Sequence, residues 1–353
     1  MNFAVDDDVM ELVESISDFF DRRGDAGQIA EATAKGGGID RTRWTALCQM
    51  GLPVLRLPEP DGIGANLLAA TAVAERIGAV LLPEPAVATM VLAEALAARP
   101  ETAELLESLS TGARLTTMSG LGIVDFDTSG GLSGQVRVAA TKGIDSVALL
   151  AGDEHTSGTA LVIVDADAFG APLGRSNLDP TRPTVVVDLA GAEPTEVLRL
   201  ADGAAERIRR EFALLTAAEL VGGMQRVLEE TKAFVTTRQQ FGRPVGSFQS
   251  IKHKLADMYA LTEQARALVQ FAALDCTVGS DTAASITGSL VRWVPRSAIS
   301  VCEEAIHLHG AMGYSWEVDI HLHLRRALAT RIALEDFDAR SIDRLLLDAE
   351  EVA

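Results

Sequence analysis

From about residue 203 onward, the chain shows the apolar spacing of long helices almost to its end. One uninterrupted stretch predicts a helix of about thirty residues, AAERIRREFALLTAAELVGGMQRVLEETKAFVTTR, and two or three further long helices follow it. Helices of this length bury their apolar stripes most readily against one another. This part of the chain, residues 201–353, is therefore predicted to form a helical bundle.

The remainder of the chain divides into a helical part and a β-rich part. Residues 1–113 read mostly as helix, as in VMELVESISDFF, where apolar residues recur at helical spacing. After about residue 114 the pattern changes to short β-branched or alternating runs between turn residues, including SGQVRVAAT, DSVALLAG, TALVIVDA and PTVVVDLAG. Such runs predict an antiparallel sheet over residues 114–200. The predicted fold class is α+β and mainly α, with an N-terminal helical domain, a middle antiparallel β domain and the C-terminal bundle.

Charge and cysteine content argue against several classes of protein. The formal net charge is −19, which argues against nucleic acid or an anionic membrane as a partner. The three cysteines are scattered and form no CxxC pair, so neither a disulfide framework nor a zinc site is predicted. The first residues lack the layout of a secretory signal, and no apolar run reaches the roughly 18 residues of a membrane span. We therefore expect a cytoplasmic protein.

A break interrupts the helical pattern after residue 237, in RQQFGRPVGSFQ. Arg238 stands just before it and can bind a phosphate through its planar guanidinium. Phe241 offers an apolar face to a ring, the adjacent glycines let backbone approach a ligand closely, and Gln249 follows as a hydrogen-bonding group. The break therefore indicates contact with a nucleotide cofactor. A helix–turn–helix corner with a surface arginine explains the same residues without a ligand.

A second segment with glycines, AIHLHGAMGYSW, lies between two further helical stretches. Gly310, Ala311 and Gly313 are small enough to leave backbone N–H groups free to face a pyrophosphate. The histidines nearby are His307, His309, His321 and His323. Histidines two residues apart do not share a helix face, and no acidic ligand pattern accompanies them, so no metal site is predicted.

Together these two segments resemble the acyl-CoA dehydrogenase family. Its members carry an R-x-x-F-G break followed by Phe-Gln or His-Gln, and later a Q-x-x-G-G-x-G stretch. Here His307 replaces the glutamine of the second motif, and Ala311 replaces one of its glycines. Landmarks of the family's N-terminal half are matched at Trp44, Gly51, Pro58, Gly62, Gly64, Glu75 and Gly78. The resemblance covers nearly the whole chain.

The resemblance implies an N-terminal helical domain (1–113), a middle β domain (114–200) and a C-terminal four-helix bundle (201–353), with FAD and an acyl-CoA between the domains. In the family, the two motifs reach across a subunit interface and touch FAD that is held mainly by the neighbouring chain. The cofactor-binding residues implied here are Arg238, Phe241, Phe248, Gln249, His307, His309, Gly310, Ala311 and Gly313.

The family's reaction is the α,β-dehydrogenation of an acyl thioester, in which a carboxylate removes the α-proton while the flavin accepts hydride. Family members place this glutamate at one of two positions. The isovaleryl-type position, 29 residues before the phenylalanine of the first motif, is Phe212 here, with Glu211 beside it. The more widespread position, 21 residues after the last glycine of the second motif, is Leu334, with Glu335 beside it. Glu211 and Glu335 are therefore candidates for the base, each one residue from an expected position, and no catalytic residue is assigned.

The family's middle domain also carries a loop that binds flavin and substrate, Thr-Glu-Pro-x-Ala-Gly-Ser-Asp, which has no counterpart here. Ser119, Thr128 or Ser129 could substitute for it. The chain thus keeps groups that reach a neighbour's FAD and lacks those of a complete site of its own. This pattern resembles the non-catalytic, β-type subunit of heteromeric actinobacterial acyl-CoA dehydrogenases of steroid side-chain degradation, which assemble as α2β2 heterotetramers.

The resulting hypothesis is an auxiliary subunit whose homologous partner chain contributes the base. Its substrate would be a bulky acyl-CoA, steroidal or similarly polycyclic, and its electron acceptor an electron-transfer flavoprotein or a similar protein. Two alternatives stay open. One is a self-sufficient homo-oligomeric dehydrogenase that uses Glu211 or Glu335 as its base. The other is a non-redox acyl-CoA-binding or scaffold protein with the same fold.

Overall fold

The computed structural model describes residues 7–23, 29, 31–32, 38–97, 99–126, 131–139, 142–152, 158–176, 178–278 and 283–351. Helices come first in the chain: α1 (Asp7–Arg23), α3 (Arg41–Gln49), α4 (Leu67–Ala79), α5 (Ala86–Ala97), the 3₁₀ turn η1 (Pro100–Thr102) and α6 (Ala103–Ser110). Side-chain caps fix where two of them begin. Asp40 accepts hydrogen bonds from the backbone N–H groups of the first turn of α3, and Asn66 accepts one from Ala69 of α4.

Strands follow, in the order β1 (Thr116–Phe126), β2 (Leu132–Ser133), β3 (Gln135–Ala139), β4 (Ser146–Gly152), β5 (Thr159–Asp165), β6 (Gly174–Ser176), β7 (Thr184–Asp188) and β8 (Glu196–Arg199). They form one sheet ordered β2-β1-β4-β5-β8 and a second ordered β3-β7-β6. The predicted antiparallel pairing holds for every strand pair of these two sheets except β1–β4, which is parallel. The chain leaves β1 to form β2 and β3 before it returns as β4, so no tight hairpin links this pair.

The central strands β4 and β5 are apolar on both faces, because each face meets a different core. Ala148 and Leu150 of β4 pack into the large core that also contains the helices. Val147 and Leu149, which alternate with them, pack into a smaller core with residues of β3 and β7. Strands buried on both faces read as continuous apolar runs, as the sequence of β4 does.

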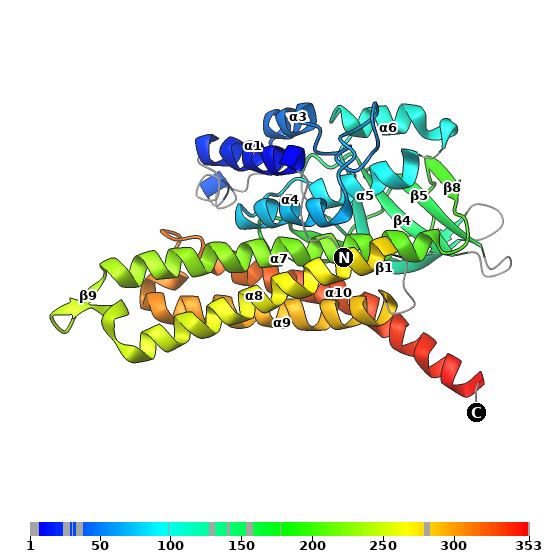
Figure 1. Ribbon diagram of the computed structural model, residues 1–353. Helices are drawn as coiled ribbons and strands as arrows, with labels where there is room; N and C mark the ends of the chain where they lie inside the picture. The colour runs from blue at the N-terminus through cyan, green and yellow to red at the C-terminus, as the bar shows by residue number, and fades with distance from the viewer. Residues whose placement is uncertain are drawn as a thin grey trace.

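The last part of the chain is the predicted bundle, with α7 (Ala204–Thr237), α8 (Gln249–Val278), α9 (Ala283–His309) and α10 (Ile320–Glu351) as its long helices. Figure 1 shows the N-terminal helices and the strands lying along one side of these helices. No helix in the described ranges combines the length and apolar character that crossing a membrane requires. The large core runs through the N-terminal helices, the sheet and the bundle, and the division at residues 113 and 200 stays a prediction.

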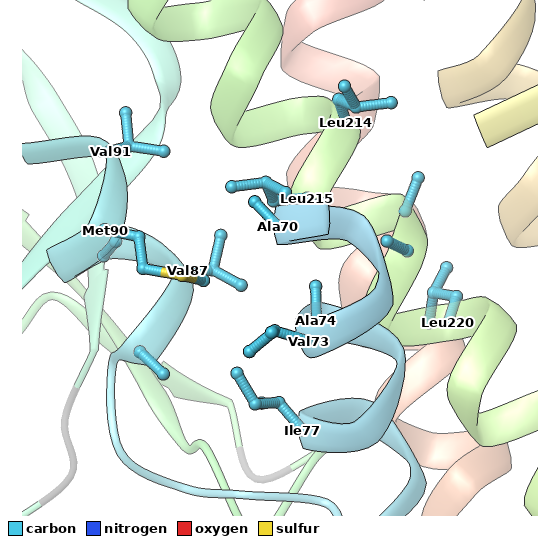
Figure 2. Packing of buried hydrophobic residues seen from close by; sticks show 14 of the residues in the cluster. Ala70, Val73, Ala74, Ile77, Val87, Met90, Val91, Leu214, Leu215 and Leu220 are labelled. Carbon is cyan, nitrogen blue, oxygen red and sulfur yellow. The ribbon is translucent and has the colours of Figure 1, made fainter. Parts of the chain in front are cut away.

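Two glycines allow α4 to lie directly on α7. A Cβ atom at Gly78 would overlap the backbone of Glu219, and a Cβ atom at Gly222 would overlap the backbone of Glu75. Around this crossing, apolar side chains of α4, α5 and α7 fill the core, as Figure 2 shows for Ala74, Ile77, Met90, Leu215 and Leu220 among others. The close contact fixes the N-terminal helices against the bundle.

Candidate functional site

The predicted break after α7 is a β-hairpin. Strand β9 (Gln239–Gln240) pairs antiparallel with β10 (Arg243–Pro244), which leaves Phe241 and Gly242 as a two-residue turn. Both turn residues have positive φ angles, +54° and +76°, as a type I′ turn requires. Glycine tolerates this conformation, but for a residue as bulky as phenylalanine it costs about 1–3 kcal/mol. The side chain of Phe241 is nevertheless 91% exposed.

The strained conformation leads to a prediction. Asparagine populates the left-handed region readily, so Phe241→Asn is expected to raise the free energy of unfolding by about 1 kcal/mol in the isolated chain. Phe241→Leu removes the ring but keeps a bulky side chain in the same conformation, and it is expected to give no such gain. Urea unfolding of the three proteins measures the difference. Equal stability of the Asn and Leu variants would show that the turn stores no strain.

Residues around the hairpin present a mixed polar and aromatic surface. Arg238 and Gln249 are exposed, and the Gln249 Nε2 atom lies 2.9 Å from Nε2 of His253. Phe248 packs its ring edge-on against Phe241, with 6.1 Å between the ring centroids. Arg243 of β10 lies over the Phe248 ring, 4.0 Å from its centroid, so this short stretch of chain holds two arginines and two aromatic rings.

The second predicted segment forms the end of α9 and the 3₁₀ turn η3 (Gly310–Tyr314). His307, Gly310 and Ala311 are exposed, whereas Gly313 is buried with its Cα against the backbone of Ile306. A Cβ atom at Gly313 would lie 2.8 Å from the Ile306 carbonyl oxygen, so the turn requires glycine there. The small residues thus allow a tight turn that exposes its own backbone.

His309 differs from the other predicted cofactor-binding residues because its side chain is buried. Its ring stacks on Phe234 of α7 with 4.3 Å between centroids, and its Nδ1 atom lies 2.8 Å from the carbonyl oxygen of Ala305. Burial lowers the pKa of His309. Two residues apart on a helix, His307 and His309 face nearly opposite directions, so only His307 faces outward.

The stacked pair of Phe234 and His309 joins the ends of α7 and α9, so the hairpin and η3 lie at the same end of the bundle (Figure 1). We call this surface the docking end, and define it by its exposed or half-buried residues Arg238, Phe241, Phe248, Gln249, His307, Gly310 and Ala311. It carries seven of the nine residues that the sequence analysis assigned to cofactor contact; the other two, His309 and Gly313, are buried. No group of three metal-ligating side chains occurs in the part of the chain that the structure describes.

A cavity of about 170 Å³ lies between the sheets, α5, α7 and α10. Its wall is largely apolar and contains Phe212 of α7 and Leu334 of α10, which stand at the two positions where the resemblance places the base. Of the described residues that line it, Asp179 and Glu219 carry carboxylates, and each is paired with an arginine. The two expected base positions therefore meet in one cavity, and both are hydrocarbon.

The two candidate bases lie elsewhere, and neither is among the residues that line this cavity. Glu211 is buried and its carboxylate accepts a hydrogen bond from Arg56, with 2.6 Å between Oε2 and Nη1. Glu335 is exposed and pairs with Arg331 one turn earlier on α10, at 3.1 Å. A one-residue step turns a helical side chain by about 100°, so Glu211 and Glu335 point away from the direction of Phe212 and Leu334.

Two ion pairs with buried carboxylates form part of the cavity wall. Both guanidinium Nη atoms of Arg182 donate to Glu219, at 2.8 and 2.7 Å, and tie the loop before β7 to α7. Arg326 of α10 binds Asp179 and Thr181 of the same loop. Burial by itself would raise the pKa of Asp179, but the Arg326 guanidinium and the Thr181 hydroxyl outweigh it, and the pKa falls below its usual range.

Of the three possible substitutes for the missing loop, Ser119 lies among the described residues. The hydroxyl of Ser119 donates to the carbonyl oxygen of Arg137 at 2.7 Å, which joins β1 to β3. Thr128 and Ser129 lie outside the described residues. Sequence reasoning also missed the pairs of Arg182 and Arg326, because each joins residues far apart in the chain and no local pattern marks them.

Near the docking end, Glu230 of α7 lies beside Asp319 and pairs with Arg226. Burial, followed by the charge of Asp319, raises the pKa of Glu230 to about 7. Between about pH 4.5 and 7, the folded chain keeps a proton on Glu230 that the unfolded chain releases. The contribution of Glu230 to the free energy of unfolding is therefore lost as pH rises through this range. We expect Glu230→Gln, which is neutral at every pH, to remove this loss, as urea unfolding between pH 5 and 8 would measure.

Glu229→Gln is the matched control, because Glu229 is the exposed neighbour on the same helix and is expected to leave the pH profile unchanged. Burial lowers the pKa of His323 to about 4, so this group lowers the free energy of unfolding as pH falls below about 6.5. Because both variants keep His323, the difference between their pH profiles reports on Glu230. Parallel profiles for Glu230→Gln and the parent would contradict the prediction.

Comparisons with known proteins agree with this architecture. Residues 204–334 match the acyl-CoA dehydrogenase, C-terminal domain, family. Acyl-CoA dehydrogenase IpdE2 of Mycolicibacterium smegmatis is 33% identical over 293 residues, which cover 82% of this chain and 82% of that protein.

Two solved structures share the fold over nearly the whole length. The Tcur3481-Tcur3483 steroid ACAD superposes with a TM-score of 0.83 at 24% identity, over 98% of this chain and 99% of that one. The ChsE4-ChsE5 complex from Mycobacterium tuberculosis gives 0.82 at 24% identity, with the same coverage. At this identity the structural likeness concerns the fold. The identity to IpdE2 over four-fifths of both chains, together with the matching C-terminal domain, shows that the chain belongs to the acyl-CoA dehydrogenase family.

Proposed function

We propose that this chain is the auxiliary, β-type subunit of a heteromeric acyl-CoA dehydrogenase, and that it contributes flavin contacts in trans to a homologous chain that carries the base. The observation that carries the proposal is the set of residues that line the 170 Å³ cavity. Phe212 and Leu334 occupy both expected base positions, and neither can remove a proton. The docking end, in contrast, keeps the groups suited to a dinucleotide and exposes them.

FAD is the cofactor that family membership supports, and when bound it supplies the hydride acceptor of the reaction. The residues of the docking end fit such a group. The Arg238 guanidinium suits a phosphate, Phe241 presents an aromatic face, and η3 offers closely approachable backbone at Gly310 and Ala311. The cavity itself, at about 170 Å³, lies below the roughly 300–1,000 Å³ of typical ligand pockets.

In the proposed division of labour, this chain orients the cofactor and its partner supplies the proton-abstracting carboxylate. The catalytic assembly would be an α2β2 heterotetramer in the cytoplasm that acts on a bulky, steroidal or similarly polycyclic acyl-CoA and passes electrons to an electron-transfer flavoprotein or a similar acceptor. The fold likeness to a steroid ACAD and to the two-protein ChsE4-ChsE5 complex supports this assignment of partner and substrate class.

The competing function is a homo-oligomer that uses Glu211 or Glu335. Their contacts argue against it, because Arg56 holds Glu211 away from the cavity and Glu335 lies on the exposed side of α10. We expect Glu335→Gln to leave the turnover of the assembled enzyme unchanged, and Glu211→Gln to change its thermal stability but not its turnover per bound flavin. If either variant slows turnover by about 100-fold or more at full flavin loading, the usual scale for a general base, that glutamate is the base.

The test of the proposal is expression of the chain alone and together with a homologous chain encoded beside it, followed by flavin counting per polypeptide. We expect a colourless or insoluble chain when it is expressed alone, and a yellow, active complex on co-expression. A yellow homo-oligomer that reduces an electron acceptor with acyl-CoA would overturn the proposal. A colourless complex that binds acyl-CoA without turnover would favour the scaffold alternative.

A further inference from the structure

A small cavity of about 10 Å³ lies in the core where α4, α7, α9 and α10 meet. Its wall includes Gly78 of α4, Gly223 of α7, Ala298 of α9, and His323 and Arg326 of α10. Roughly 10–15 Å³ is the smallest space that holds one water molecule. The cavity is therefore of the right size for one water and for no organic ligand.

Two polar atoms on residues that border this cavity are buried and have no hydrogen-bond partner among the described residues. They are Nη1 of Arg326 and Nε2 of His323, whose residues are only 5% and 3% exposed. The remaining donors of Arg326 are engaged, since Nε binds Asp179 and Nη2 binds Thr181. Buried polar atoms in folded proteins are nearly always hydrogen-bonded, to protein or to ordered water.

The chemistry of the two atoms fits a single shared water. Nη1 of Arg326 can only donate, so its partner must be an acceptor. The His323 ring is neutral near pH 7, because burial lowers its pKa to about 4, and one nitrogen of a neutral imidazole accepts. Gly223 makes room for this ring, since a Cβ atom there would lie 3.0 Å from Nδ1 of His323. An apolar occupant would leave both nitrogen atoms unsatisfied.

We propose that one water molecule is a fixed part of this core, where it accepts a hydrogen bond from Nη1 of Arg326 and donates one to Nε2 of His323. The water gives Nη1 of Arg326 a hydrogen-bond acceptor, so that each nitrogen of the guanidinium has a partner. It thereby positions the guanidinium so that its other two nitrogens face Asp179 and Thr181, at the wall of the 170 Å³ cavity. It also selects the His323 tautomer that carries its proton on Nδ1.

The test is a crystal structure of the full chain, with its partner chain where purification requires one, at a resolution that shows ordered water. We expect density for one water within hydrogen-bonding distance of both nitrogen atoms. The ¹⁵N shifts of the His323 ring should show an unprotonated Nε2. The proposal would be overturned if no water density lay between the two nitrogen atoms. It would also be overturned if the side chains were rearranged so that Arg326 and His323 bound protein groups directly.

Two serine variants on α9 provide a matched comparison. Ala298→Ser places a hydroxyl at the cavity, and we expect it to displace the water and to keep Tm within about 2 °C of the parent. Ala305→Ser makes the same change in the apolar core away from the cavity, and we expect Tm to fall by roughly 2–10 °C. Equal losses of Tm in both variants, with no water displaced by Ala298→Ser, would also overturn the proposal.

Discussion

Replacement of Arg326 by methionine is expected to lower the free energy of unfolding by about 3–5 kcal/mol, the usual cost of leaving one member of a buried ion pair without its partner. Arg326 is 5% exposed, and its partner Asp179 is 2% exposed. Methionine fills much of the same volume but leaves the buried Asp179 carboxylate without its cation. That carboxylate then keeps its hydrogen bonds from the hydroxyl and the backbone N–H of Thr181. Urea or thermal unfolding of the purified protein measures the loss.

The matched control is Arg331→Met on the same helix. Arg331 forms an exposed pair with Glu335, with side chains 45% and 59% accessible, so its removal is expected to change stability by less than about 1 kcal/mol. A second variant, Arg326→Met combined with Asp179→Leu, removes both charges and is expected to regain most of the loss. An Arg326→Met protein as stable as the Arg331→Met control would contradict the prediction.

The pH dependence of this effect has a definite sign. The pKa of Asp179 is lowered in the folded chain, so its ionised form stabilises the fold at pH values above its usual range. That contribution disappears as pH falls through the usual range and then through the lowered value. We therefore expect the difference in stability between the parent and Arg326→Met to be largest near neutral pH and to shrink in acid.

Replacement of Arg238 by leucine is expected to weaken flavin binding by the assembled enzyme by about 10- to 100-fold. A hydrogen bond to a charged group is worth about 1.5–3 kcal/mol, and Arg238 is the exposed cation at the base of the hairpin that would meet a phosphate. Leucine keeps the apolar stem and removes the charge. Equilibrium dialysis of the complex against FAD, with absorbance at the flavin band, measures the change.

Lys232→Leu is the control for this experiment, since Lys232 is also an exposed cation but lies on α7, outside the docking end. We expect it to change flavin affinity by less than about 2-fold, the scale of an exposed charge acting through solvent. A higher salt concentration should weaken flavin binding by the parent more than by Arg238→Leu. Salt screens the attraction between the Arg238 guanidinium and the phosphate, and only the parent has that guanidinium. Unchanged flavin affinity in Arg238→Leu would remove the docking end from the proposed function.

Much of the fold follows from patterns within single segments. The apolar spacing of AAERIRREFALLTAAELVGGMQRVLEETKAFVTTR specifies α7 because a helix needs only its own residues for its hydrogen bonds. The glycines and proline of RQQFGRPVG favour an end to the helix there, because glycine lowers helix propensity and proline lacks the backbone N–H that a helix uses. The four-helix bundle and the β-rich middle part were predictable for the same reason.

The candidate site was predictable only in part, and the exceptions have physical causes. Counting along the sequence identified Phe212 and Leu334, but it could not show that residues from α7 and α10 line one cavity. His307 and His309 belong to one motif, yet helix geometry turns one outward and stacks the other on Phe234. The parallel pairing of β1 with β4 depends on how the intervening chain crosses, which strand propensity does not encode.

Local sequence was sufficient to predict where helices and strands form and which motifs the chain carries, because these properties depend on neighbouring residues. Residue identity alone shows that both positions expected for a catalytic glutamate hold hydrocarbon side chains. Which side chains share a space depends instead on how the elements pack. The ion pairs of Arg182 with Glu219 and of Arg326 with Asp179 join segments 37 and 147 residues apart. Such contacts form when the sheets pack on the bundle, and their strength comes from burial that no single segment provides.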